Sequence, residues 1–168
     1  MKSLNLYISE RLVVNKDYKD LYTCEPKTFD ELRKIIEDRY NELGPGTKDM
    51  PIDFNDIDVS NIYSFCNKNT NNGIFQQTKF KYIDISDWNV SNVESMFHMF
   101  YCCNELKSVG DLSKWDISNV EDMTSMFESC KQLKSVGDLY NWNVSNVKFM
   151  YYMFFGSGIT NIPKWYKR

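Results

Sequence analysis

The segment that follows Trp88 carries apolar residues at three- and four-residue steps, and the same pattern follows Trp115. The two series are Val93, Met96, Met99, Phe100 and Cys103, and then Val120, Met123, Met126, Phe127 and Cys130. This spacing is typical of one buried face of a helix. Each series begins with a Ser-x-x-Glu sequence, the form of a capping box that starts a helix. We therefore expect one short helix in each segment.

A second apolar pattern lies before each tryptophan. Residues 80–85 have the apolar spacing of a leucine-rich-repeat strand, and residues 106–112 and 133–139 repeat it with one glycine inserted, Gly110 or Gly137. A glycine inside a strand indicates a bulge. The pattern predicts three equivalent strands.

These segments belong to an internal repeat. Trp88, Trp115 and Trp142 recur every 27 residues, Trp165 follows after 23, and a degenerate unit with a polar insertion starts near Ile57. Four units thus cover roughly residues 55–168. Because one unit cannot bury its apolar face alone, we expect the units to stack. The predicted fold is α/β, a short leucine-rich-repeat solenoid with parallel strands on one side and short helices on the other.

The N-terminal part lacks the repeat. Thr28 to Glu31 form a capping box, an apolar stripe follows, and Gly44-Pro45 ends it, so we expect a helix from about Phe29 to Leu43. Residues 1–50 are predicted to cap the solenoid, and residues 51–168 to form the repeats. A short helix or strand over residues 3–14 is a weaker expectation.

The consensus W-[DN]-[VI]-S-N-V-x-x-M-x-x-M-F-x-x-C-x-x-L resembles the BspA-like leucine-rich repeats over about two thirds of the chain. Members of that family are mostly non-catalytic recognition or adhesion modules of bacterial surfaces, and some occur in phages and parasitic protists. The resemblance implies binding without naming a ligand. Glu10 and Arg11 interrupt the apolar stretch that a secretion signal needs, so we expect a cytoplasmic or virion-associated protein.

Composition narrows the function further. The 168 residues carry a net charge of −3, which argues against a nucleic-acid partner, and no apolar run approaches the length of a membrane span. The chain has one histidine and an odd count of five cysteines without Cys-x-x-Cys spacing, and it lacks phosphate-binding loops. We therefore predict no metal, no cofactor and no enzymatic activity.

Aromatic residues at outward positions of the last full repeat are the strongest binding candidates: Phe149, Tyr151, Tyr152 and Phe155, with Phe97 and Tyr101 in an earlier repeat. Two explanations compete. The C-terminal tail, residues 165–168, covers these side chains, or they dock a partner protein or a second copy of the chain.

Three equivalent aspartates, Asp84, Asp111 and Asp138, should stack as a column along the strands, beside a column of lysines. They form either a charged binding face or, as we favour, a solvated face on which lysines offset acidic repulsion. The expected function is non-catalytic recognition of an unidentified protein. The alternative is a structural or packaged component of a phage particle, with the repeats serving homo-oligomer or spacer contacts.

Overall fold

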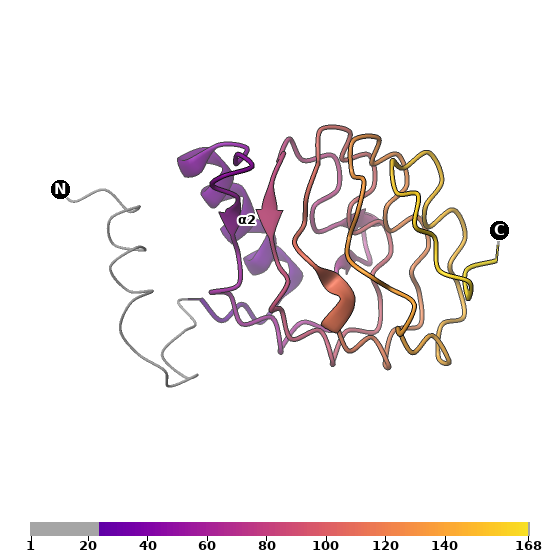
Figure 1. The fold of residues 1–168 in the computed structure, drawn as a ribbon. Helices are drawn as coiled ribbons and strands as arrows, with labels where there is room; N and C mark the ends of the chain where they lie inside the picture. The colour runs from indigo at the N-terminus through magenta and orange to yellow at the C-terminus, as the bar shows by residue number, and fades with distance from the viewer. Residues whose placement is uncertain (1–23, 168) are drawn as a thin grey trace.

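A computed structural model describes residues 24–167 and places successive coils of the chain side by side, from an N-terminal helix to the C-terminal end (Figure 1). Outside the helix, most of the chain is irregular and rich in turns. The elements in order are α2 (Phe29–Leu43), β1 (Ile52–Asp53), β2 (Cys66–Asn67), β3 (Asn72–Gly73), β4 (Ile83–Asp84) and the 3-10 helix η2 (Leu112–Lys114). The expected element over residues 3–14 lies outside the described residues.

Helix α2 confirms the predicted N-terminal helix. Thr28 Oγ1 accepts a hydrogen bond from the Glu31 amide at 3.2 Å, and Gly44, with a φ of 75°, ends the helix. The Glu31 carboxylate accepts the amide of Lys27 at 2.6 Å, one residue before the amide of the N-cap Thr28 that a standard capping box uses. Leu32 and Ile36 are fully buried, so the apolar face of α2 packs on the core.

The predicted strands form only in part. β1 and β4 pair in parallel, β2 and β3 form an antiparallel hairpin in the polar insertion, and Tyr82 and Ser108 form an isolated parallel bridge. Residues 133–139 form no strand. Gly110 and Gly137 explain the shortening, because φ values of 85° and 90° turn the chain there. A side chain at either position would collide with the aspartate of the preceding coil, so both turns require glycine.

The helices predicted after each tryptophan are wrong. In the middle coil the amides of Met123, Ser125, Phe127 and Ser129 donate to carbonyls of the next coil, at 2.8 to 2.9 Å, instead of to carbonyls of their own turn. The amides of Met96, His98, Phe100 and Cys102 do the same one coil earlier. His98 and Ser125 have positive φ values, which no helix interior allows. The buried stripe is correct all the same, because Val93, Met96 and Cys103 are 0% exposed.

The serines thought to cap these helices have another role. The amides of Ser91, Ser118 and Ser145 donate to the side chain two residues earlier, at 3.0 to 3.2 Å, in local turns. The following asparagine side chains, of Asn92, Asn119 and Asn146, donate to a carbonyl of the preceding coil at 2.6 to 2.8 Å. The S-N pair therefore fixes a turn and joins it to the previous coil.

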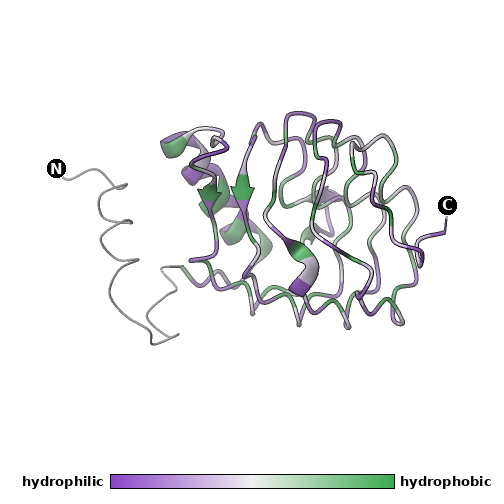
Figure 2. Cartoon of the chain, in the orientation of Figure 1, coloured by the Kyte–Doolittle hydropathy of each residue, from purple (hydrophilic) through white to green (hydrophobic). Residues whose placement is uncertain are grey.

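Side-chain ladders connect the coils through the core. The indole N–H groups of Trp88, Trp115, Trp142 and Trp165 each donate to a main-chain carbonyl about one repeat earlier, at 2.8 to 3.2 Å. Phe100, Phe127 and Phe154 stack with ring centroids 5.5 and 5.8 Å apart. Apolar residues recur in coil after coil along the molecule (Figure 2). The buried ones belong to one core cluster.

Candidate functional site

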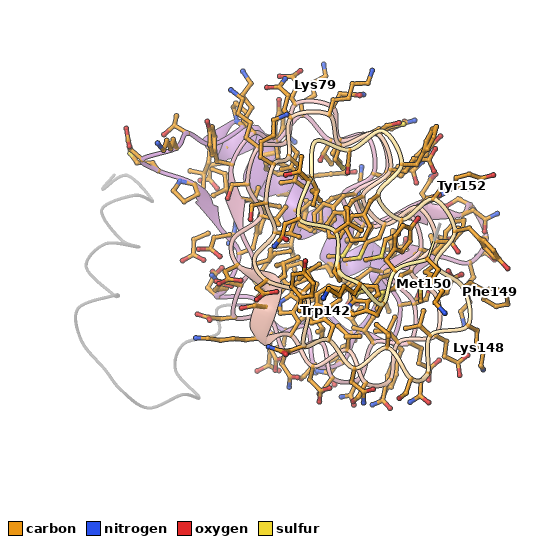
Figure 3. All side chains as sticks on the ribbon, turned by 45° about the vertical axis from the view of Figure 1, so that its right-hand side comes forward. Lys79, Trp142, Lys148, Phe149, Met150 and Tyr152 are labelled. Atoms are coloured by element: carbon orange, nitrogen blue, oxygen red, sulfur yellow. The ribbon has the colours of Figure 1, made fainter. Side chains whose placement is uncertain are left out.

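Four large aromatic side chains lie exposed on the last full coil. Phe149 is 48% exposed, and Tyr151, Tyr152 and Phe155 are each 63% or 64% exposed. We call these four residues the aromatic patch. Figure 3 shows Phe149 and Tyr152 at the outer rim of the coils, with Lys148 beside Phe149. The patch is built as two pairs, Phe149 with Tyr151 and Tyr152 with Phe155, whose ring centroids are 6.3 and 5.9 Å apart.

The patch replaces polar residues that stabilise the preceding coil. There, Asp122 accepts the amide of Thr124 at 2.8 Å, and Ser125 donates to Glu128 at 2.5 Å. The equivalent residues 27 positions later are the four aromatics, which cannot make these bonds. The aromatic side chains therefore do not stabilise the local turn by hydrogen bonds as the polar side chains do, and they expose apolar surface.

The C-terminal tail covers one side of the last coil only. Trp165 stacks on Trp142 at 6.4 Å, and the ring of Tyr166 meets Phe154 edge-on at 5.1 Å. The aromatic patch stays exposed. Of the two explanations offered by the sequence, tail capping thus applies to Trp142 and Phe154, and it leaves the patch uncovered by residues 24–167.

A cavity of about 690 Å³ opens between the tail and the last coil. We call it the terminal groove. Its lining includes Tyr151, Tyr152 and Phe155 of the patch, Ile159 and Ile162 just before the tail, and the lysines Lys148 and Lys167. Lys148, Ile159 and Ile162 were not among the residues predicted from the sequence, and Lys167 was predicted only as part of a covering tail. The shortened interval before Trp165 was the available signal, because a shorter unit leaves part of the previous coil uncovered.

The other two aromatic candidates form a separate group. Phe97 and Tyr101 lie two coils earlier, half-buried on either side of His98, with ring centroids 3.8 and 4.5 Å from the imidazole. Both rings thus stack on the imidazole of His98, which lies between them. The Cys102 side chain raises the pKa of Tyr101 above its ordinary value of 10. The polar coil of Thr124 and Glu128 separates this group from the aromatic patch.

The three aspartates lie outside the terminal groove, and their carboxylates stabilise turns. Asp84, Asp111 and Asp138 each accept the amide two residues later, from Ser86, Ser113 and Tyr140, at 2.9 to 3.0 Å. The bond from the Ser113 amide lowers the pKa of Asp111 below its ordinary value of 3.8. Each of the three carboxylates is thus used in a hydrogen bond that stabilises its own turn.

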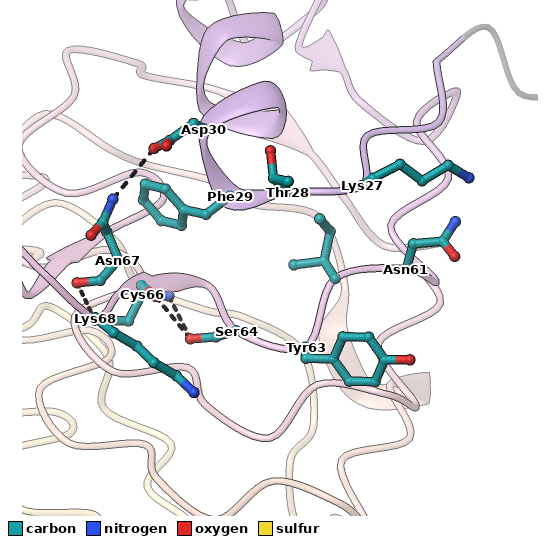
Figure 4. A pocket seen from close by; sticks show the side chains of 11 residues that line it. Lys27, Thr28, Phe29, Asp30, Asn61, Tyr63, Ser64, Cys66, Asn67 and Lys68 are labelled. Carbon is teal, nitrogen blue, oxygen red and sulfur yellow. Dashed lines mark hydrogen bonds between the residues drawn. The ribbon is translucent and has the colours of Figure 1, made fainter.

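A smaller cavity of about 290 Å³ lies beside the start of α2 (Figure 4). Two of its polar side chains, those of Asn67 and Ser64, already have partners. Asn67 donates to Asp30 at 3.3 Å, and Ser64 accepts the amide of Cys66 at 3.1 Å. Burial raises the pKa of the Cys66 thiol to about 11, so it is a poor nucleophile at neutral pH.

The chemistry of the remaining groups is limited. Cys103 and Cys130 are fully buried, and their thiols donate to carbonyls of the preceding coil at 2.9 and 3.0 Å. The Cys103 side chain and burial raise the pKa of the Cys130 thiol. Within residues 24–167, no three His, Cys, Asp or Glu side chains are grouped as metal ligands. Over the same residues, no helix combines the length and apolar character needed to cross a bilayer.

Comparison with known proteins gives one match. No curated protein and no solved structure matches the chain. A family model described as "Mycoplasma protein of unknown function, DUF285" matches residues 47–165, which are the coils without α2. Since the match extends over more than half of the chain, the protein belongs to the DUF285 family.

Proposed function

We propose that the chain is a non-catalytic protein-recognition module, and that its coils are a BspA-like leucine-rich-repeat solenoid presenting the aromatic patch to a partner protein. The single observation that carries the proposal is the exposure of four large aromatic side chains on one coil, at positions that are polar in the coil before it. Tyrosine and phenylalanine in such a cluster are typical anchors of protein interfaces.

The rigidity of the scaffold supports this proposal. The patch is mounted on a coil whose carbonyls accept four amides of the previous coil, and Met153 behind it is fully buried. A partner therefore meets side chains whose backbone is already ordered, which lowers the entropic cost of binding.

The experiment is partner capture from the native host with the purified chain as bait. The variant Tyr151→Ala/Phe155→Ala should lose most of the captured partner while its far-ultraviolet circular dichroism stays unchanged. The matched control is Tyr63→Ala, because Tyr63 is 61% exposed but lies on another part of the coils. Equal capture by the double variant and the wild type would refute the patch as the binding site.

The alternative function, a structural or packaged phage component, predicts a defined homo-oligomer. Light scattering of the wild-type chain separates the two proposals. A monomer supports recognition of another protein, and a stable oligomer supports the structural role.

A further inference from the structure

The two ends of the stacked coils carry opposite kinds of unpaired backbone groups. Within the stack, alternate amides of one coil donate to carbonyls of the next, as Phe100 does to Met126 at 2.9 Å. Along this segment the first coil therefore presents carbonyls outward and the last coil presents amides, whereas just before the segment the direction reverses, as Lys148 donates its amide to the Glu121 carbonyl at 2.8 Å. Each end needs a different kind of cap.

At the N-terminal end the chain supplies its own cap. Arg33 and Arg39 of α2 extend to the outward carbonyls, Arg33 Nη1 donating to Ile74 at 2.6 Å and Arg39 Nη1 to Asp53 at 2.5 Å. Ile74 occupies the position whose equivalent in the next coil, Met99, accepts the amide of Phe75. Guanidinium groups thus replace the amides that a preceding coil would donate.

At the C-terminal end no such cap is present among residues 24–167. The outward amides are those of Met150, Tyr152, Phe154 and Gly156, two residues apart and equivalent to the donors of the earlier coils, and none of them has an acceptor in this part of the chain. We call these four amides the terminal edge. They border the terminal groove, whose charged lining residues are both cationic: Lys167, and Lys148, which already pairs with Glu121 at 2.8 Å.

We propose that the terminal edge and groove bind an acidic polypeptide segment of another protein, which adds one further coil to the stack. This inference rests on the proposed recognition function and names the chemistry of its partner. The partner's carbonyls would accept the four amides, as the carbonyls of residues 149, 151, 153 and 155 accept those of the coil before. Its carboxylates would pair with Lys167 and share Lys148 with Glu121, and its apolar side chains would pack on the patch.

A second copy of the chain fits this surface less well than an acidic partner. Two copies joined at their terminal edges would bring amide donors against amide donors and lysines against lysines. A head-to-tail arrangement is obstructed because α2 and its two arginines already occupy the carbonyl end. Donors and positive charge on one face require acceptors and negative charge on the other.

The chain itself provides a probe of the right chemistry. Residues 115–130 form a coil of the required path and contain four acids, Asp116, Glu121, Asp122 and Glu128, and no lysine or arginine. A synthetic peptide of this sequence, with serine at the last position, serves as the partner segment. In a second peptide the four acids are replaced by their amides.

The test is a titration of the full-length chain with each peptide, followed by amide NMR. We expect the acidic peptide to bind with a dissociation constant below 1 mM, to shift the four terminal-edge amides and to slow their exchange. We expect about fivefold weaker binding for the neutral peptide and for Lys148→Gln/Lys167→Gln, since rim ion pairs contribute modestly. The matched control, Lys79→Gln/Lys114→Gln, removes the same charge outside the groove and should bind as the wild type does.

Three results would overturn the inference: no binding at 1 mM, equal binding of both peptides, or shifts confined to other amides. A dimer in light scattering in which the terminal-edge amides are protected from exchange without peptide would also overturn it, by making a second copy the occupant. The three titration results are distinct from failure of the proposed function, because none of them affects capture of the host partner through Tyr151 and Phe155. A dimer would instead count for the structural role.

Discussion

The ladder of phenylalanine rings makes Phe127→Ala the most informative stability variant. Phe127 is fully buried and lies between Phe100 and Phe154, so truncation leaves a cavity bounded on both sides by rings that the neighbouring coils hold in place. Removing a buried phenylalanine side chain typically costs about 3 to 5 kcal/mol. Domains of this size are stable by roughly 5 to 15 kcal/mol, so the loss is a large part of the total.

Urea denaturation followed by tryptophan fluorescence and circular dichroism measures this loss. We expect coincident transitions, a midpoint well below that of the wild type, and a fall in Tm of roughly 10 °C. The matched control is Phe155→Ala, which truncates an exposed phenylalanine and should change the free energy of unfolding by less than about 0.5 kcal/mol. A cost for Phe127→Ala below about 1 kcal/mol would refute the stacked core.

Three further predictions follow from the caps, the turns and the repeat. Arg33→Met leaves the Ile74 carbonyl without its donor and should cost about 1 to 3 kcal/mol of unfolding free energy in urea. The control Lys34→Met loses an ion pair of the same spacing and length, on a more exposed side chain, and no carbonyl contact, so it should cost under about 0.5 kcal/mol. Equal costs would contradict the cap. Because the pKa of Asp111 is lowered in the folded chain, its carboxylate stabilises the fold fully above the ordinary value of 3.8, and this contribution is lost as pH falls through the lower folded value. In urea titrations below about pH 4, Asp111→Asn should therefore lose stability less steeply than the wild type. Parallel pH profiles would contradict this prediction. Deleting residues 116–142 removes one full repeat and should leave a cooperatively folded chain by circular dichroism melting, whereas deleting residues 116–135 breaks the register and should abolish the transition.

The sequence predicted local elements wherever local interactions decide the outcome. Helix α2 has the predicted bounds because its capping threonine, its apolar face and its terminal glycine all act within the helix itself. The buried positions of the repeats, such as Met96 and Met123, were likewise predicted correctly, because burial follows from the spacing of apolar residues.

The helices predicted after each tryptophan failed for a non-local reason. The spacing of three and four residues also fits a coil that turns every few residues while alternate amides bond to the next coil. Single-sequence periodicity reports which side chains are buried and does not report which carbonyl receives an amide. The clue was the repetition itself, since an identical neighbour in register offers every amide such a competing acceptor.

The candidate site was predicted in part. The four aromatics were identified by comparing equivalent positions of the repeat, and they lie together on one coil. The groove behind them depends on how the tail folds back, through the contacts of Trp165 with Trp142 and of Tyr166 with Phe154, and no local pattern encodes that path. The three aspartates drew attention by their alignment, yet each caps a turn of its own coil.

The central claim is that the coils stack in register and leave an open edge of amides at the C-terminal end. Residue-resolved amide hydrogen exchange tests this claim most directly. The account predicts strong protection of Met123, Ser125, Phe127 and Ser129, whose amides donate to the last coil, and fast exchange 27 residues later at Met150, Tyr152, Phe154 and Gly156. Fast exchange in the first set would contradict the stacking of the coils. Equal protection of both sets in the isolated chain would contradict the open edge.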